Sequence, residues 1–505
     1  ESLMLNASLE PHDTTERSIY WSSSNTAVAT VSADGTVTAV SEGSVTVTAV
    51  SANTEIKAEC TVIVNSSEAW YYTYTVKDDG TAEITGYRTG LQGDIVIPSY
   101  VHEYRVTSIG DFAFNGCNSL TSVIIPEGVT SVGLRAFYNC SGLTSVIISE
   151  GVTRIGYAAF EYCSSLTSVI IPDGVMRIGY AAFRDCSSLT NITVDENNAK
   201  YSSDERGVLF NKEKTTLIQY PIGNTATSYE IPLSVTRIGD DAFRGCSSLV
   251  SVTIPESVTS IGGYAFYGCS SLVSVTIPEG VTSIGNFAFE GCSSLTSVTI
   301  SEGVTRIGNW AFSDCSSLTT VTIPSSVTSI GYSAFEGCSS LTSVTIPEGV
   351  TGIDSSAFEY CSSLTSVNIP KSVTSIGDYA FFDCRSLKDV YYPGTEEAWK
   401  KISIGSYNTK LTNATIHYNA TVLTPSVTRT ADGTVYKVSA ANLPVSSVVV
   451  VALYKDGRFV GYESAVYNGE TLEIAADTPH DSATILAWSD LEKLIPLAPG
   501  TKIGS

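Results

Sequence analysis

The stretch Val258-Thr-Ser-Ile-Gly-Gly-Tyr-Ala-Phe-Tyr-Gly-Cys-Ser-Ser-Leu-Val-Ser-Val-Thr-Ile-Pro-Glu-Gly280 is one copy of a unit that repeats along most of the chain. Its cysteine marks a period of 23 residues, with one gap of 60. The cysteines in this series are Cys117, Cys140, Cys163, Cys186, Cys246, Cys269, Cys292, Cys315, Cys338, Cys361 and Cys384. A unit this short buries its apolar face only against its neighbours, so the repeat predicts a solenoid of stacked coils.

The second half of the unit predicts a strand. Leu272, Val275 and Ile277 have the spacing of a half-buried strand, and Pro278 and Gly280 end it and turn the chain. In the first half, apolar residues recur four positions apart, which indicates a short helical turn with one buried stripe. These are Ile261, Ala265 and Cys269. We therefore expect an α+β repeat solenoid, with one strand plus a short helical turn in each coil.

The consensus V-T-x-I-G-x-x-A-F-x-x-C-S-S-L-x-x-V-x-I-P-x-G resembles the 23-residue leucine-rich repeat of BspA-like bacterial surface proteins. The resemblance covers residues 65–420. It includes a hairpin N-cap at about residues 68–93 and a C-cap at about residues 391–420, and residues 195–232 form a long, divergent coil. It implies a leucine-rich repeat protein that is secreted or held at a bacterial cell surface, and thus extracellular.

Two all-β, sandwich-like modules are expected at the ends of the chain. Residues 1–64 have short alternating strands such as Val28-Ala-Thr-Val31 and resemble the bacterial Ig-like domain type 2, with its first strand expected to be missing. The chain therefore looks like a trimmed piece of a longer protein. Residues 421–505 predict a C-terminal β-sandwich, with hairpin turns at Asp456-Gly457 and Asn468-Gly469.

Composition excludes some classes of function. The chain has 505 residues, 28 Lys and Arg, 51 Asp and Glu, and a net charge of −23. Such an acidic chain repels phosphate backbones, which argues against general binding of nucleic acid. It contains no run of 18 or more apolar residues, so we expect no membrane insertion.

The residues also argue against catalysis. The four histidines are scattered, and the sequence contains no HExxH, GxSxG or phosphate-binding loop motif. A repeat tends to place identical side chains in rows, whereas an active site needs different groups that converge. We expect no enzyme activity, no cofactor and no metal site. The cysteine series is interpreted as buried, reduced space filler, because eleven cysteines cannot all pair.

Two groups of side chains are candidates for binding. The first is an apolar stripe at one outward strand position, which consists of Val96, Ile124, Ile147 and Ile170. It is either a protein-binding patch, a surface that a neighbouring domain covers, or a row that strand preference alone explains. The second is an aromatic contact face, which consists of Tyr157, Tyr180, Tyr264, Trp310, Tyr332 and Tyr379. Its alternative role is packing between coils.

A further row of arginines is interpreted more simply. Arg154, Arg177, Arg237 and Arg306 share one repeat position and offset acidic residues at the turns, such as Glu127 and Glu279.

These features lead us to expect an adhesin-like binding protein without catalytic activity. It would present a rigid repeat surface to host extracellular or bacterial surface proteins. One alternative is a carbohydrate-binding accessory of a polysaccharide-degrading system, which would need coplanar exposed rings and would bind glycans. The other is a structural spacer within a larger surface protein.

Overall fold

The repeats form parallel sheets because equivalent residues of successive coils lie opposite each other. Val275 lies opposite Val298, and Thr276 lies opposite Thr299. The computed structural model describes residues 2–7, 18–41, 43–52, 56–64, 71–88, 90–420, 422–430, 433–441, 448–455, 458–466, 472–476, 482–488 and 501–504. It divides into two compact units, Glu1–Ser203 and Asp204–Ser505.

The first unit begins with two three-stranded antiparallel sheets, in the orders β1-β4-β3 and β2-β5-β6. Val37, Val45 and Val47 belong to the core that they share. The strands are β1 (Ser2–Met4), β2 (Ile19–Ser23), β3 (Ala29–Val31), β4 (Thr36–Ala39), β5 (Gly43–Ser51) and β6 (Lys57–Val64).

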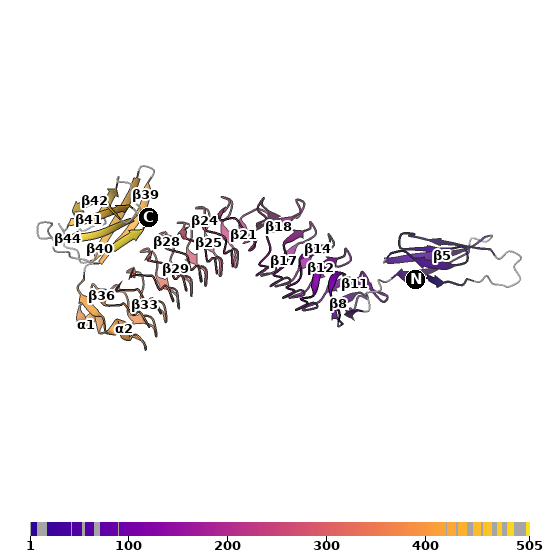
Figure 1. Ribbon diagram of the computed structural model, residues 1–505, viewed down its shortest axis with the longest axis horizontal. Helices are drawn as coiled ribbons and strands as arrows, with labels where there is room; N and C mark the ends of the chain where they lie inside the picture. The colour runs from indigo at the N-terminus through magenta and orange to yellow at the C-terminus, as the bar shows by residue number, and fades with distance from the viewer. Residues whose placement is uncertain are drawn as a thin grey trace. The chain divides into compact units, whose positions relative to one another are not determined.

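The coils of the first unit carry two sheets, and their strands are stacked side by side in Figure 1. One sheet contains β9 (Gly93–Val96), β12 (Leu120–Ile125), β14 (Ser145–Ile148), β16 (Ser168–Ile171) and β18 (Asn191–Val194). The other contains the antiparallel hairpin β7 (Tyr72–Val76) and β8 (Ala82–Tyr87), then β11 (Tyr104–Ile109), β13 (Ser131–Val132), β15 (Arg154–Ile155) and β17 (Arg177–Ile178). Strand β10 (Tyr100–Val101) pairs with β11, and β19 (Tyr201–Ser203) ends the unit. Residues 68–70 and 89 of the expected N-cap lie outside the described residues.

The second unit opens with an antiparallel pair at the divergent coil and continues with regular coils. One series of strands consists of β20 (Leu209–Asn211), β21 (Thr216–Gln219), β23 (Arg237–Ile238), β25 (Ser260–Ile261), β27 (Ser283–Ile284), β29 (Arg306–Ile307), β31 (Ser329–Ile330), β33 (Gly352–Ile353), β35 (Ser375–Ile376) and β37 (Ser403–Ile404). The other consists of β22 (Ser228–Glu230), β24 (Ser251–Thr253), β26 (Ser274–Ile277), β28 (Ser297–Ile300), β30 (Thr320–Thr322), β32 (Ser343–Thr345), β34 (Ser366–Asn368), β36 (Asp389–Tyr392) and β38 (Thr415–Tyr418).

The C-terminal strands form two further sheets, in the orders β39-β40-β43 and β42-β41-β44-β45. Tyr436, Val449 and Leu453 belong to their core. The strands are β39 (Val422–Thr430), β40 (Gly433–Ala441), β41 (Val448–Lys455), β42 (Arg458–Val466), β43 (Leu472–Ala476), β44 (Ser482–Trp488) and β45 (Thr501–Gly504). The expected turns at Asp456-Gly457 and Asn468-Gly469 lie outside the described residues.

The core of the coils is a column of stacked rings. The ring centroids of Phe266 and Phe289 lie 5.0 Å apart, and those of Phe289 and Phe312 lie 5.2 Å apart, with nearly parallel planes. In the first unit, Phe137 and Phe160 stack in the same way at 5.2 Å. Each ring thus gives one face to the preceding coil and one to the next, so every coil completes the core of its neighbours.

The expected α+β class is wrong, because the arc between the two strands of a coil is not helical. Ile261, Ala265 and Cys269 are buried, as the pattern indicated. The backbone, however, has positive φ at Tyr264 (55°) and Gly268 (68°), which interrupts any helix. In the described part of the chain, the helices are α1 (Glu396–Trp399) and α2 (Thr409–Thr412), both near the C-terminal end of the repeats.

Hydrogen bonds between coils replace those that a helix would make. The backbone N–H groups of Tyr264, Phe266 and Gly268 donate to carbonyl oxygens of the next coil at 2.7–2.9 Å. The intervening N–H of Tyr267 donates to Tyr264, three residues earlier, as in a turn. The arc therefore depends on the neighbouring coil for its backbone hydrogen bonds, which an isolated unit cannot satisfy.

Candidate functional site

The four residues of the predicted apolar stripe lie on neighbouring strands of one sheet in the first unit. Ile124 on β12 lies opposite Val96 on β9 and opposite Ile147 on β14, and Ile170 follows on β16. Exposed fractions are 45% for Val96, 56% for Ile147 and 63% for Ile170, while Ile124 is half-buried. At a strand spacing of ~4.8 Å, four residues form a row about 15 Å long.

The surroundings of the apolar stripe are polar and mostly uncharged. Ser122, Ser145 and Ser168 form a parallel row two positions earlier on the same strands. At the edge strand, Asp94 accepts hydrogen bonds from the hydroxyls of Thr121 and Ser122, and these lower the pKa of its carboxyl group. The stripe ends at β18, where Thr193 lies opposite Ile170. In the second unit the equivalent positions of five successive strands, β24 to β32, are threonines, including Thr253, Thr276 and Thr299.

The predicted aromatic contact face is not one row, because its members occupy two adjacent repeat positions. Tyr157, Tyr180 and Tyr332 occupy the position just before the first positive-φ residue and are exposed. Tyr264, Trp310 and Tyr379 occupy the positive-φ position itself and are half-buried. Only some of them are brought together. Tyr157 lies beside Tyr180 with centroids 5.9 Å apart, and Trp310 contacts Tyr332.

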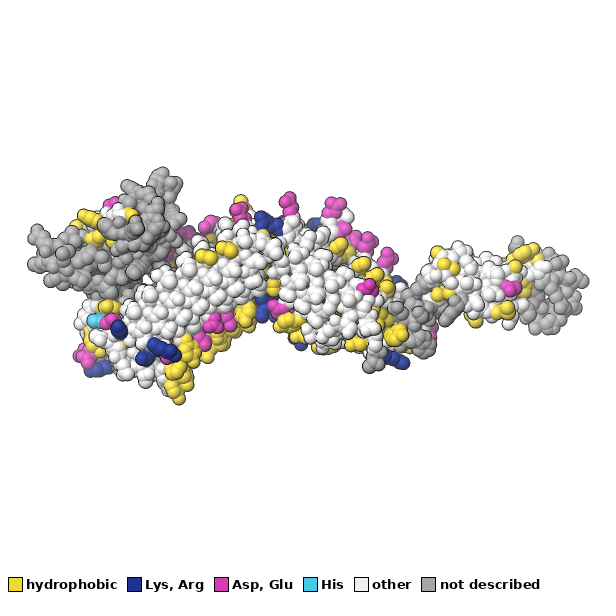
Figure 2. Space-filling view, viewed as in Figure 1, with side chains coloured by type: hydrophobic (Ala, Val, Ile, Leu, Met, Phe, Trp, Pro, Cys, Tyr) yellow, Lys and Arg dark blue, Asp and Glu magenta, His cyan; other side chains and the backbone are white. Residues whose placement is uncertain are grey.

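In the second unit, these rings stack on one another along the direction of the coils. Phe287 lies between Tyr264 and Trp310, at centroid distances of 4.5 and 4.7 Å and with nearly parallel planes. Tyr379 stacks in the same way on Tyr407 at 4.3 Å. Figure 2 shows hydrophobic side chains gathered in a row along the lower edge of the coils that Figure 1 labels β29 and β33.

The two ends of this stack are also covered. The Arg244 guanidinium lies 5.4 Å from the centroid of the Tyr264 ring, and Tyr332 meets Trp310 edge to face at 4.6 Å. Partial burial raises the pKa of the Tyr264 hydroxyl. Because the faces of the rings contact each other, mainly their edges reach solvent. The coplanar, open platform that stacking on a sugar requires is therefore not formed by Tyr264, Phe287 and Trp310.

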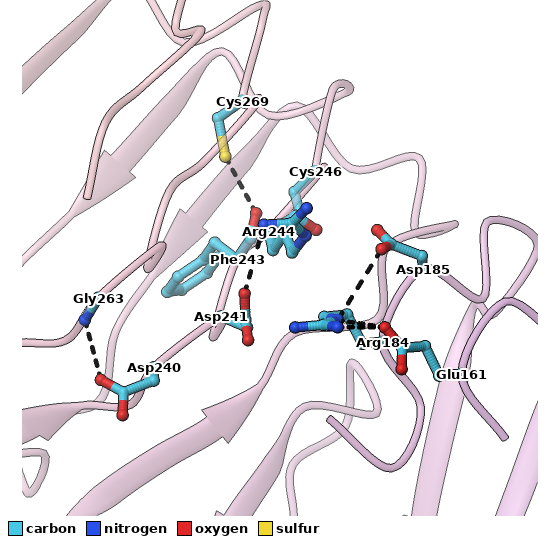
Figure 3. Close-up of polar contacts among 10 residues, drawn as sticks. All are labelled: Glu161, Arg184, Asp185, Asp240, Asp241, Phe243, Arg244, Cys246, Gly263 and Cys269. Atoms are coloured by element: carbon cyan, nitrogen blue, oxygen red, sulfur yellow. Dashed lines mark hydrogen bonds and ion pairs between the residues drawn. The ribbon is translucent and has the colours of Figure 1, made fainter. Parts of the chain in front are cut away.

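Sequence reasoning missed a buried ion pair in the first unit. The Glu161 carboxylate, which is 1% exposed, accepts hydrogen bonds from Nε of Arg184 at 2.7 Å and from its Nη2. Figure 3 shows the Arg184 guanidinium between Glu161 and Asp185 and, in the second unit, Arg244 facing Asp241. Glu161 and Arg184 share one repeat position in successive coils, and their opposite charges were an available signal.

Sequence reasoning also missed Tyr407. Ile404-Gly-Ser-Tyr407 has the pattern of Ile376-Gly-Asp-Tyr379, so the C-terminal cap continues the repeat position even though its period differs. Tyr379 and Tyr407 both have positive φ, so their side chains leave the backbone in the same direction and their rings stack.

Within the described ranges, no group of three or more His, Cys, Asp and Glu side chains is placed to hold a metal ion. No helix among the described residues is long and apolar enough to cross a membrane.

Two solved structures are similar to this chain, and the first of them supports the fold. The chain is similar to a leucine-rich repeat protein from Eubacterium ventriosum, with 28% identity, a TM-score of 0.51, and coverage of 63% of this chain and 94% of that one. It is also similar to the pneumococcal vaccine antigen PcpA, with 18% identity, a TM-score of 0.47, and coverage of 69% and 96%.

One curated protein matches over a short stretch. An alpha-L-arabinofuranosidase from Bifidobacterium longum is 42% identical over 69 residues, which make up 14% of this chain and 6% of that protein. This chain thus spans only a small part of that relative.

Two family descriptions match. The bacterial Ig-like domain (group 2) matches residues 1–62, and the BspA type leucine rich repeat region (6 copies) matches residues 93–205, 223–342 and 307–428. The repeat region covers more than half of the chain, which therefore belongs to the BspA-type leucine-rich repeat family.

Proposed function

We propose that this protein is a secreted or cell-surface bacterial binding protein, adhesin-like and without catalytic activity, whose apolar stripe docks a protein of the host or of another bacterium. One observation carries the proposal: Val96, Ile124, Ile147 and Ile170 form a continuous, largely exposed apolar row on a regular sheet. Soluble surfaces rarely expose such rows unless a partner covers them. Membership of a repeat family with extended, repetitive surfaces supports the same role.

The two units have different residue types at the strand position of the apolar stripe. In the second unit, threonines occupy this position at Thr253, Thr276 and Thr299. The fold itself therefore does not require an apolar side chain there. Threonine and isoleucine are both good strand formers. Backbone preference therefore does not explain why the first unit has isoleucine.

The geometry of the aromatic residues disfavours the carbohydrate-binding alternative. Tyr264, Phe287 and Trp310 cover one another's faces, whereas a sugar needs open faces on which to stack. Tyr157 and Tyr180 are exposed but tilted by 36° to each other.

The decisive experiment measures binding of the purified chain to a panel of immobilised host matrix proteins and glycans. Replacing Ile124, Ile147 and Ile170 with Thr removes apolar area and keeps the strand preference. We expect saturable binding to a matrix protein, weakened about tenfold or more by this variant, because burial of three isoleucines contributes several kcal/mol.

A matched control replaces Thr253, Thr276 and Thr299 with Ser at the same strand position in the second unit, and we expect it to bind like the native chain. Binding that the isoleucine variant retains in full would contradict the proposed site. If the chain binds no member of the panel, the alternative role as a structural spacer within a larger surface protein would be favoured instead. Labelling of intact cells with an antibody to this chain tests the proposed location, with lysed cells as the comparison.

A further inference from the structure

Two arginines lie side by side on a second surface of the first unit. Arg154 on β15 is the register partner of Arg177 on β17, and both side chains are exposed. Like charges directly opposite on neighbouring strands repel each other. Among the described residues, no carboxylate lies within ion-pair distance of Arg154 or Arg177. The pair therefore makes no direct ion pair, among the described residues, with the acidic residues that it was expected to offset.

The equivalent arginines of the second unit are arranged differently. Arg237 lies opposite Ser260, and Arg306 lies between two serines, so neither has an arginine neighbour. Arg237 also has a carboxylate partner three residues later, Asp240, at 3.9 Å. In the first unit the residues three positions after the arginines are Tyr157 and Tyr180. The first unit thus has exposed tyrosines where the first regular coil of the second unit has a neutralising aspartate.

A third arginine extends the same surface. The Arg135 guanidinium lies 4.9 Å from the centroid of the Tyr138 ring and 5.9 Å from that of Tyr157. In the described part of the chain, its buried Nε has no hydrogen-bond acceptor, and no ion pair joins Arg135 to a carboxylate, so its charge contacts rings instead. The coil that contains Arg177 adds an exposed apolar side chain, Met176, where other coils have threonine.

This combination has the composition of the centre of a protein interface. Arginine, tyrosine and methionine are enriched there relative to the rest of a protein surface. The charge of the surface is opposite to that of the chain, which has a net charge of −23. A positive surface on so acidic a protein attracts negatively charged groups, such as the carboxylates of an acidic partner.

We propose that this surface, here called the arginine–tyrosine face, binds an acidic segment of a partner protein. It consists of Arg135, Arg154, Arg177, Tyr157, Tyr180 and Met176. An exposed methionine and tilted rings favour a polypeptide, which brings apolar side chains together with its carboxylates, over a glycan. The inference builds on the proposed protein-binding function by naming the chemistry of a partner. The two are tested with different variants and different ligands, so either can fail alone.

The test measures binding of a fluorescein-labelled poly-glutamate peptide to the full chain by fluorescence anisotropy, at low and at moderate salt. The variant Arg154→Ser/Arg177→Ser uses the residue that other coils have at this position, such as Ser131 and Ser260, so the fold should be kept. Arg237→Ser/Arg306→Ser is the matched control, because it makes the same change of charge at the same repeat position. Circular dichroism and thermal unfolding check the folding of both.

We expect the native chain to bind poly-glutamate, salt to weaken the binding, and the Arg154/Arg177 variant to lose about tenfold or more in affinity. The Arg237/Arg306 variant should bind like the native chain. Three results would overturn the inference: no binding at low salt, equal losses in the two variants, or binding of dextran sulfate in the absence of any binding to poly-glutamate.

Discussion

The Sγ atom of Cys292 donates a hydrogen bond to the carbonyl oxygen of Phe266, which lies 3.2 Å away in the preceding coil. The same oxygen also accepts the backbone N–H of Cys269. Cys269 and Cys315 make the equivalent contacts to Phe243 and Phe289, at 3.0 and 3.2 Å. Cys269, Cys292 and Cys315 therefore do more than fill space, because each of them links its coil to the one before.

Stability should fall at alkaline pH because of these thiols. Burial raises the pKa of Cys186, Cys292 and Cys384 from 9.0 to about 12. The unfolded chain loses these protons at lower pH than the folded chain does. Their contribution to stability is therefore complete below pH 9 and is lost between about pH 9 and 12, by up to about 1.4 kcal/mol per thiol and pH unit.

Urea unfolding at a series of pH values checks this. A variant with alanine at Cys186, Cys292 and Cys384 should be less stable at neutral pH and should lose stability less steeply above pH 9. Parallel curves for the variant and the native chain would show that the thiols are not the cause.

Thiol reactivity should divide the cysteines into two classes. All twelve are free, Cys60 is exposed, and the other eleven are buried. Only the thiolate reacts, so a buried and protonated thiol is protected. We expect an aromatic disulfide reagent to modify Cys60 alone in the native protein and all twelve after denaturation without reductant. Cys60→Ser should abolish the native reaction, and a denatured count far below twelve would indicate disulfides.

The stacked phenylalanines should dominate the stability of the coils. Phe289 is fully buried between Phe266 and Phe312. Phe289→Ala should lower the free energy of unfolding by about 3–5 kcal/mol, because it leaves a cavity in two coils at once. Phe287→Ala, two residues away in the half-exposed stack, is the matched control and should cost less. Chemical denaturation gives both values, and equal losses would contradict the role assigned to the core column.

The effects of substituting Glu161 and Arg184 on stability should be coupled, because the two side chains form a buried ion pair. Arg184→Leu leaves the Glu161 carboxylate buried without its cation, which typically costs 3–5 kcal/mol. The double variant Glu161→Leu/Arg184→Leu should be more stable than Arg184→Leu, since no buried charge is left unpaired. The free energy of unfolding is measured for each single variant and for the double variant. A loss in the double variant equal to the sum of the two single losses would contradict the expectation.

Some of the candidate surfaces followed from the sequence and some did not. A fixed period places residues 23 positions apart on neighbouring strands, which predicted that Ile124 and Ile147 would adjoin. The aromatic residues were harder, because Tyr332 and Trp310 lie one repeat position apart and only the backbone conformation shows which of them stacks on Phe287. The arginine–tyrosine face depends on which arginines lack a carboxylate, and this is a property of three-dimensional distances.

The sequence by itself determined the period, the register and the core of this protein. Identical units must stack with Val275 opposite Val298 and with Phe266 on Phe289, since only this register buries every apolar stripe. The tertiary structure decided the conformation of the arc. Ile261, Ala265 and Cys269 have a spacing that fits either a helical turn or a chain of tight turns facing inward. The turns prevail because the N–H groups of Tyr264 and Phe266 reach carbonyl oxygens of the next coil, and these acceptors exist only once the coils are stacked.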